Sequence, residues 1–235
     1  MRIPLTKYGM PQVLVVPLII LAAMAIIALV SMQIWPLPVV LLIELLPSAL
    51  LIFSLSFFRD PHRQCPSDSN LLLSPADGKV TEIETIEGNG DSGRAGLKIG
   101  IFLSVFNTHI NRAPCNVRVE KITYKKGMYK NALNPESGKV NESNELQFVR
   151  TDSPNDKIAV KQISGAIARR IVCKTDVEDE LAAGEKFGMI KFGSRTELYI
   201  PFSSDTSNEM KCLVKIGDKV KAGLTALVRY EKCQE

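Results

Sequence analysis

Two long runs of apolar residues open the chain. Residues 11–32 carry no charge, and residues 37–58 carry only Glu44. Each run approaches the ~20 apolar residues that a helix needs to cross a bilayer, so we predict two membrane helices. Only residues 33–36 lie between the runs, and two prolines, Pro36 and Pro38, suit a tight turn there. The helices should therefore form a hairpin whose two ends lie on the same side of the membrane.

Positive residues flank both outer ends of this hairpin. Arg2 and Lys7 precede it, and Arg59, His62 and Arg63 follow it. Because such residues favour the cytoplasmic side, we expect both ends and the rest of the chain in the cytoplasm, at the cell membrane. A cleaved signal peptide is the alternative for the first run, but that run is longer than a usual signal core and a second follows almost at once. A buried pair of core helices is a further alternative, although both runs are apolar all round.

The pattern changes after Arg63 from continuous apolar runs to short alternating ones separated by turn residues, which is typical of strands. The strands are expected at residues 79–86, 97–103, 117–124, 145–149, 158–163 and 213–216. Residues 88–93 and 134–138 have the composition of loops, and a short helix is expected near residues 105–109. The sequence therefore predicts a membrane anchor over residues 1–58 and a mostly β domain over residues 59–235.

One internal repeat lies within the β domain. The segment Asp-Glu-Leu-Ala-Ala-Gly at 179–184 matches Asp-Lys-Val-Lys-Ala-Gly at 218–223, and each leads into another apolar stretch. A turn, an apolar residue and Ala-Gly before a strand resemble the hammerhead step of lipoyl- and biotinyl-type domains. Two such steps predict two β halves that face each other, as in a duplicated barrel-sandwich hybrid.

Composition narrows the classes of function. The five cysteines are odd in number and show no Cys-x-x-Cys spacing, which argues against a disulfide framework and against a zinc site. The formal net charge of +4 is mild and suits a surface beside an anionic membrane. Basic and aromatic residues are not interleaved, so we expect no nucleic-acid partner, and we expect no bound metal.

The chemistry begins at Gly193 and Ser194, inside the segment Phe-Gly-Ser-Arg at 192–195. In a strained turn the hydroxyl of Ser194 can attack the carbonyl of Gly193 and convert the amide to an ester. Loss of the serine Cα proton and elimination would leave dehydroalanine, and hydrolysis would release ammonia and leave a pyruvoyl group. Glycine suits the first position because it has no Cβ to obstruct the attacking oxygen. Gly-Ser is also a common turn dipeptide, so the surrounding sequence must decide between a self-cleavage site and an ordinary turn.

Two other residues complete a candidate relay. Asp77 lies in the segment Ser-Pro-Ala-Asp-Gly-Lys-Val at 74–80, and His109 lies in Thr-His-Ile-Asn-Arg-Ala-Pro at 108–114. A carboxylate can orient an imidazole, and an imidazole can take the proton of an attacking hydroxyl such as that of Ser194. An Asp-Gly turn and a structural histidine are the plainer interpretations.

Four ordered segments resemble the phosphatidylserine decarboxylase family, in the short branch that carries an arginine after the cleavage serine. They are residues 57–61 (FFRDP), 74–80 (SPADGKV), 102–114 (FLSVFNTHINRAP) and 187–195 (FGMIKFGSR). The resemblance implies a proenzyme that splits at Gly193-Ser194 into a β chain, 1–193, and an α chain, 194–235. The two chains would stay together as a heterodimer, with a covalent pyruvoyl cofactor derived from Ser194.

The resemblance also implies the reaction and the residues. The pyruvoyl carbonyl would form a Schiff base with phosphatidylserine, and loss of CO2 would give phosphatidylethanolamine without pyridoxal phosphate or a metal. Asp77, His109 and Ser194 fall on the family's aspartate, first histidine and pyruvoyl precursor. Arg112 stands where the family has a second histidine, so His109 is expected to serve processing, decarboxylation or both.

Charge suggests two substrate contacts, since Arg195 or Arg112 could pair with the phosphate or carboxylate of the substrate. The membrane hairpin fits a lipid substrate. Three alternatives stay open. The first is a membrane-anchored lipoyl- or biotinyl-type carrier or transport adaptor, with Lys191 as the modified residue. The second is a pyruvoyl enzyme for another lipid, and the third is a protein that never processes itself.

Overall fold

The computed structural model describes residues 4–87, 95–152, 155–166, 170–191, 193–202 and 208–232. The chain divides into two compact units, Met1–His62 and Arg63–Glu235. The division therefore falls four residues after the boundary expected at residue 58. Each unit is described by itself below.

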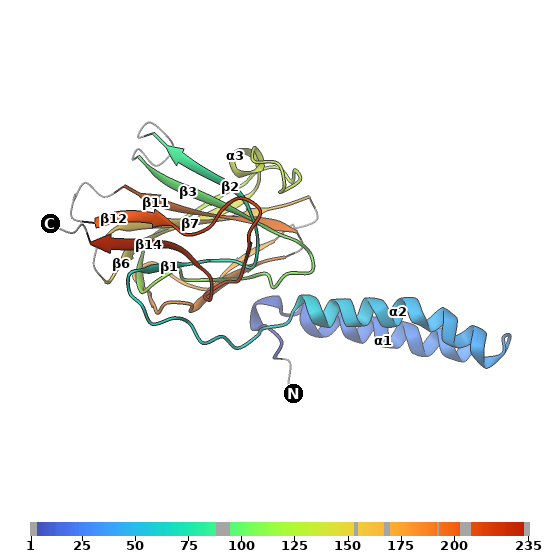
Figure 1. The fold of residues 1–235 in the computed structure, drawn as a ribbon. Coiled ribbons are helices and arrows are strands. Elements are labelled where there is room, and N and C mark those ends of the chain that lie inside the picture. Colours follow the sequence, from blue (N-terminus) through green and yellow to red (C-terminus); the bar gives the residue numbers. More distant parts are fainter. Residues whose placement is uncertain are drawn as a thin grey trace. The chain divides into compact units, whose positions relative to one another are not determined.

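The first unit is a helical hairpin, as predicted. It contains η1 (Lys7–Gly9), α1 (Gln12–Ser31) and α2 (Leu37–Phe57). Figure 1 shows α1 and α2 lying side by side. The Thr6 N–H donates to the carbonyl of Phe58 at 2.9 Å, and the Asp60 N–H donates to that of Pro4 at 2.7 Å. These bonds join the segment before α1 to the segment after α2, so both outer ends of the hairpin lie together.

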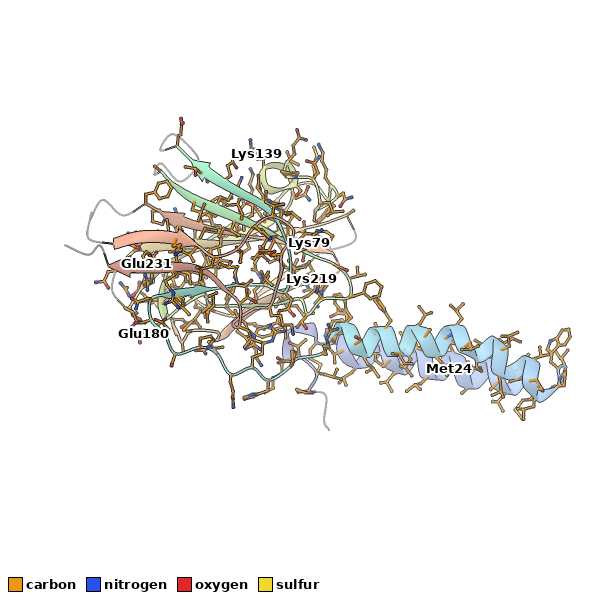
Figure 2. All side chains as sticks on the ribbon, in the orientation of Figure 1. Met24, Lys79, Lys139, Glu180, Lys219 and Glu231 are labelled. Carbon is orange, nitrogen blue, oxygen red and sulfur yellow. The ribbon has the colours of Figure 1, made fainter. Side chains whose placement is uncertain are left out.

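Both helices are long and apolar enough to cross a membrane. Their large side chains point outward, as Leu18 at 64% and Leu46 at 69% exposure illustrate. Met24 on α1 is labelled in Figure 2 among these side chains. A hairpin this exposed and this apolar needs a surrounding that is apolar too, which a bilayer supplies.

The second unit is mostly β, as predicted. Its described elements are β1 (Leu71–Leu73), β2 (Gly78–Ile86), β3 (Gly96–Leu103), β4 (Ile110–Arg112), β5 (Val117–Lys125), α3 (Ser137–Val140), β6 (Ser143–Arg150), β7 (Lys157–Ser164), β8 (Ile171–Cys173), β9 (Glu180–Leu181), β10 (Lys186–Ile190), β11 (Ser194–Pro201), β12 (Asn208–Cys212), β13 (Lys219–Val220) and β14 (Ala226–Lys232). Five of the six predicted strands are confirmed, with ends that move by at most two residues.

The strands form one large antiparallel sheet and two small ones. The large sheet has the order β13-β2-β3-β11-β7-β6-β5-β9, and the small sheets have the orders β1-β14-β12 and β4-β10-β8. At one edge of the large sheet Lys219 pairs with Lys79, and both are labelled in Figure 2. Strand β11 lies in the middle of the sheet, between β3 and β7 (Figure 1). The backbone of β11 is therefore held by a neighbouring strand on each side.

Two local predictions were wrong. Residues 213–216 are not a strand, because the chain turns there and the Asp218 carboxylate accepts the N–H of Lys215 at 3.0 Å. Residues 105–109 are not a helix, because the Asn107 side chain accepts the N–H of Ser104 at 2.9 Å and closes a turn instead. The expected loop at 88–93 lies outside the described residues, and the last two residues of the loop expected at 134–138 belong to α3.

The predicted repeat has matching hydrogen bonds in its two copies. Gly184 N–H donates to the carbonyl of Ala113, and Gly223 N–H donates to that of Ser74, both at 2.8 Å. Both glycines have positive φ, 76° and 70°, which a residue with a Cβ rarely adopts. Residues 113–119 follow residues 74–80 by the same spacing of 39 that separates the two glycines. The duplication thus extends beyond the two hammerhead steps to the strands that they cap.

Candidate active site

The predicted cleavage bond lies at the start of the central strand. Ser194 opens β11, where it pairs with Leu103 of β3 and with Ser164 of β7. Its side chain is fully buried, and its hydroxyl has no hydrogen-bond partner among the residues that the structure describes. A buried hydroxyl without a partner is costly, and such groups concentrate where function requires them. Phe192 lies outside the described residues.

Gly193 has a backbone conformation that favours glycine, with φ of 62°. Its carbonyl oxygen lies directly over Gly165, so that a Cβ at position 165 would overlap that oxygen. Both glycines are therefore needed where the chain turns into β11. Because neither glycine has a side chain, neither residue obstructs the Gly193 carbonyl that Ser194 would attack.

His109 is held against the same turn by two strands. It directly precedes β4 and is fully buried. Its carbonyl accepts the N–H of Ile190 at 3.1 Å, which ties it to the end of β10. Its ring nitrogen Nε2 accepts the N–H of Gly193 at 3.3 Å, and Nδ1 lies 2.9 Å from the carbonyl of Asn107. The structure thus brings His109 to Gly193, the residue before the predicted cleavage bond, although 84 residues separate the two along the chain.

Asp77 makes different contacts from those that the relay predicts. Its carboxylate binds the Arg63 guanidinium through two bonds of 2.6 and 2.7 Å. It also accepts the N–H of Ala222 at 2.8 Å. The ring of His109, in contrast, has the carbonyl of Asn107 at Nδ1. A hydrogen bond between Asp77 and His109 is therefore not what orients the imidazole in this structure.

Asp77 has a counterpart in the second copy of the repeat. Asn116 follows it by 39 residues, and the Asn116 side-chain oxygen accepts the N–H of Ala183 at 2.8 Å. Ala183 precedes Ala222 by the same spacing, so Asp77 and Asn116 cap equivalent turns. One function of Asp77 is therefore structural, and an uncharged amide performs it in the other half.

Known proteins are similar in sequence to this chain over most of its length. The family model for phosphatidylserine decarboxylase matches residues 50–228. The chain belongs to this family. A phosphatidylserine decarboxylase proenzyme of Desulfotalea psychrophila is 43% identical over 74% of this chain and 78% of its own. That of Rhodopirellula baltica is 38% identical over 98% of this chain and 90% of its own, and that of Syntrophus aciditrophicus is 42% identical over 79% and 83%.

Membership of the decarboxylase family makes the chain a carboxy-lyase, and it directs attention to the two arginines predicted to bind substrate. Arg195 is fully buried, and its guanidinium binds Glu197, Thr81 and Glu82. Since side chains alternate along a strand, Arg195 lies on the face of β11 opposite Ser194. This geometry does not favour a substrate contact for Arg195. Arg112 is also buried and donates to the carbonyl of Gly184 at 2.9 Å.

A buried polar network on the Ser194 face of β11 was not predicted from the sequence. Asn111 donates to the hydroxyl of Thr196 at 3.0 Å and accepts from Gln162 at 2.9 Å. Gln162 in turn accepts from Asn144 at 3.2 Å. Asn111, Thr196 and Gln162 are fully buried. The sequence feature that could have predicted this network is the occurrence of polar residues at alternate positions of otherwise apolar strands. Asn111, for example, lies two residues after His109.

Lys191 is buried as well, at 5% exposure. Burial, and then the charge of Arg170, lowers the pKa of Lys191. A lysine that carries lipoate or biotin must reach a partner enzyme from an exposed tip. The burial of Lys191 and the family membership of the chain therefore both disfavour the carrier alternative.

Proposed function

We propose that this chain is a phosphatidylserine decarboxylase proenzyme that cleaves itself between Gly193 and Ser194. The observation that carries the proposal is the meeting of three features at one bond. They are a buried hydroxyl on Ser194, a positive φ at Gly193, and Nε2 of His109 at 3.3 Å from the Gly193 N–H. The relatives are phosphatidylserine decarboxylase proenzymes, which supports the same reaction.

The cleavage step follows from these positions. The Ser194 hydroxyl attacks the Gly193 carbonyl carbon, its proton passes to a base, and the C–N bond breaks to give an ester. His109 is our candidate for that base, because its Nε2 lies at the N–H of Gly193 and would take the proton once that hydrogen bond is released. Removal of the Cα proton of residue 194 then expels the Gly193 carboxylate. Addition of one water and loss of one ammonia leave a pyruvoyl group at residue 194.

The residues present fit such a group. Residue 194 is buried and held by β3 and β7, and its neighbour Gly193 donates a hydrogen bond to the buried imidazole of His109. A pyruvoyl group there would supply a carbonyl that condenses with the substrate amine and accepts the electrons of the bond to the departing carboxylate. His109 would hold or return the proton at the substrate Cα, and the Asn111–Thr196 pair would fix the strand beside it. Asp77 would act through the turn at Ala222 and through Arg63.

Substrate recognition and location belong to the same proposal. Arg112 remains our candidate for the substrate phosphate or carboxylate. The two apolar helices would keep the β domain at the lipid headgroups, with the flanking positive charges on the cytoplasmic side. Protease accessibility of the β domain in sealed right-side-out and inverted vesicles tests the sidedness. Cleavage from the outer side of right-side-out vesicles would contradict it.

Intact-mass analysis of the purified full chain in detergent tests the proposed function. We expect two fragments, 1–193 and 194–235, with the second lighter than a serine-ended fragment by one ammonia. Ser194→Ala should stay in one piece. The wild-type sample should convert phosphatidylserine in mixed vesicles to phosphatidylethanolamine, and Ser194→Ala should not. An uncut wild-type chain would indicate a protein that never processes itself, and a cut chain inactive on phosphatidylserine would indicate another amine lipid.

A further inference from the structure

Strand β11 carries three polar side chains on the face that Ser194 does not share. They are Arg195, Glu197 and Tyr199, which alternate with Ser194, Thr196 and Leu198. Arg195 is fully buried and Glu197 is 2% exposed. Ionised side chains this deeply buried are rare unless they are paired and hydrogen-bonded. Their position directly after residue 194 calls for a physical explanation.

The guanidinium of Arg195 is bound through all three of its nitrogens. Its Nε donates to Glu197 Oε1 at 2.7 Å, and its Nη1 donates to the hydroxyl of Thr81 at 3.0 Å. Its Nη2 binds Glu82. The other carboxylate oxygen of Glu197 accepts a hydrogen bond from the hydroxyl of Tyr199. Two of the three partners of Arg195, Thr81 and Glu82, belong to β2, which is two strands away from β11 in the sheet.

A glycine and a β-bulge make this reach across β3 possible. Gly100 of β3 pairs with Glu197 on one side and with Glu82 on the other. A Cβ at Gly100 would overlap Nη2 of Arg195, so the guanidinium crosses β3 at a point without a side chain. The pairing of β2 with β3 shifts between Val80 and Glu82, which leaves Thr81 as the extra residue beside Glu82. The sheet is thus built locally around this one side chain.

The segment that contains α3 covers the cluster from outside. A Cβ at Gly138 would come within 2.7 Å of Glu197 Oε1, so the backbone there packs closely on the carboxylate. Excluding water strengthens each ion pair and makes it costly to remove one partner, because the other charge is then left buried and unpaired. An exposed pair such as Arg118–Glu178, whose side chains are 41% and 67% exposed, contributes far less.

We propose that Arg195 is a positioning residue that anchors the new N-terminus of the α chain to the β chain after self-cleavage. This inference rests on the proposed function, because cleavage creates that end. Before cleavage, residue 194 is fixed through its peptide bond to Gly193. Afterwards it is the end of a strand, and strand ends fray. Arg195 and Glu197 then belong to the α chain, whereas Thr81 and Glu82 belong to the β chain.

The anchor assigns to Arg195 a role other than the substrate contact predicted from its charge. Arg195 is the residue next to the reactive carbonyl, and its side chain would fix this end of the strand through contacts on the opposite face of the sheet. Arginine suits this function because its planar fork binds three partners in fixed directions, which the single ammonium group of a lysine cannot do. Arg195→Lys should therefore keep the charge and lose the anchor.

Hydrogen exchange of the peptide 194–200 tests the proposal in the full chain in detergent. In the cleaved protein, we expect Arg195→Lys to accelerate exchange on the order of tenfold. In the uncleavable Ser194→Ala background, the same change should have a clearly smaller effect, because the peptide bond still holds residue 194. Arg118→Lys is the matched control and should change exchange in neither background. A merely structural arginine would accelerate exchange equally in both.

Gly100→Ala provides a second variant in case Arg195→Lys fails to fold or to cleave. It leaves every charged group in place and fills only the gap that the guanidinium crosses, so it should reproduce the acceleration in the cleaved protein. Equal exchange in cleaved wild type and cleaved variants would overturn the anchor and leave the proposed function intact. A wild-type chain that mass analysis finds uncut would overturn both.

Discussion

The N–H of Gly193 donates to Nε2 of His109 across 3.3 Å, and this contact assigns the tautomer of the neutral ring. A nitrogen that accepts a hydrogen bond carries no proton, so the proton of the neutral imidazole lies on Nδ1. There it faces the carbonyl of Asn107 at 2.9 Å, an acceptor. Both contacts thus assign the same tautomer. The basic nitrogen of His109 lies towards the bond that we expect to break, as a general base requires.

Replacing His109 by alanine should slow self-cleavage by about 10²–10⁴-fold, the usual contribution of a general base. Intact-mass analysis over time after synthesis measures the loss of the 235-residue species. His62→Ala is the matched control, because His62 is the only other histidine of the chain and belongs to the helical unit. Wild-type rates of both cleavage and decarboxylation in His109→Ala would rule out the assigned role.

The counterpart of Asp77 in the other half of the repeat makes it possible to test two roles of Asp77 separately, its turn cap and its charge. Asn116 caps Ala183 through an amide oxygen, as Asp77 caps Ala222 through a carboxylate oxygen. Asparagine at position 77 should therefore keep the cap. It would also leave the buried Arg63 without its carboxylate, so the variant to measure is Asp77→Asn/Arg63→Gln.

We expect this double variant to be more stable than Asp77→Ala/Arg63→Gln by about 1–3 kcal/mol, the cost of leaving the Ala222 N–H without its acceptor. Urea unfolding in the Ser194→Ala background measures the difference without interference from cleavage. With Ser194 restored, the Asn variant should still cleave, because Nδ1 of His109 lies at the Asn107 carbonyl. A folded but uncut Asn variant would instead show that the carboxylate of Asp77 is needed for the chemistry.

Gly165 offers a test of the turn that precedes Ser194. An added Cβ there would overlap the carbonyl oxygen of Gly193, and the obstacle is backbone, which cannot rotate away. We therefore expect Gly165→Ala to displace that carbonyl and to slow cleavage at least tenfold, since small misplacements of reacting atoms are costly. Gly217→Ala is a useful control. It strains the backbone, because Gly217 has a positive φ of 103°, but its Cβ would meet only the end of the Lys79 side chain. Equal cleavage in wild type and Gly165→Ala would contradict this account.

Local patterns predicted the fold well wherever one physical rule dominated. The two apolar runs predicted the two helices, because a continuous apolar surface of that length has few other stable surroundings. Alternation gave the long strands of the large sheet. The prediction was wrong at residues 213–216, whose apolar side chains suggested a strand. There the Asp218 side chain closes a turn, and Ile216 remains 63% exposed.

The site was less predictable, because its contacts join residues far apart in sequence. The motifs identified Gly193, Ser194 and His109, and the structure places Nε2 of His109 at the N–H of Gly193. Charge alone predicted a substrate contact for Arg195 but not its buried partners. Glu82 lies 113 residues away, and the two side chains meet only because the sheet order places Gly100 between them. The repeat of hammerhead steps was visible in sequence, yet the equivalence of Asp77 and Asn116 emerged only from matching hydrogen bonds.

The ion pairs of Lys98 should make the stability of the β domain depend on pH. A hydrogen bond from Lys98 lowers the pKa of Glu84 below 4.5. Burial opposes the charge of Lys98, but its bonds to Glu84 and Glu82 outweigh this and raise its pKa. A carboxyl with a lowered pKa stabilises the fold above its unfolded value, and this contribution disappears as the pH falls through the folded pKa.

Lys98→Met should therefore destabilise the Ser194→Ala protein at pH 7 and have a smaller effect towards pH 3. The difference at pH 7 should stay below about 1 kcal/mol for the Glu84 pair, because the Glu84 side chain is 53% exposed and solvent screens the pair. Urea unfolding at several pH values measures it. Lys211→Met, which removes an exposed partner of Glu231, is the control and should show little dependence on pH. A difference that grows as the pH falls would mean that Lys98 does not stabilise the ionised form of Glu84.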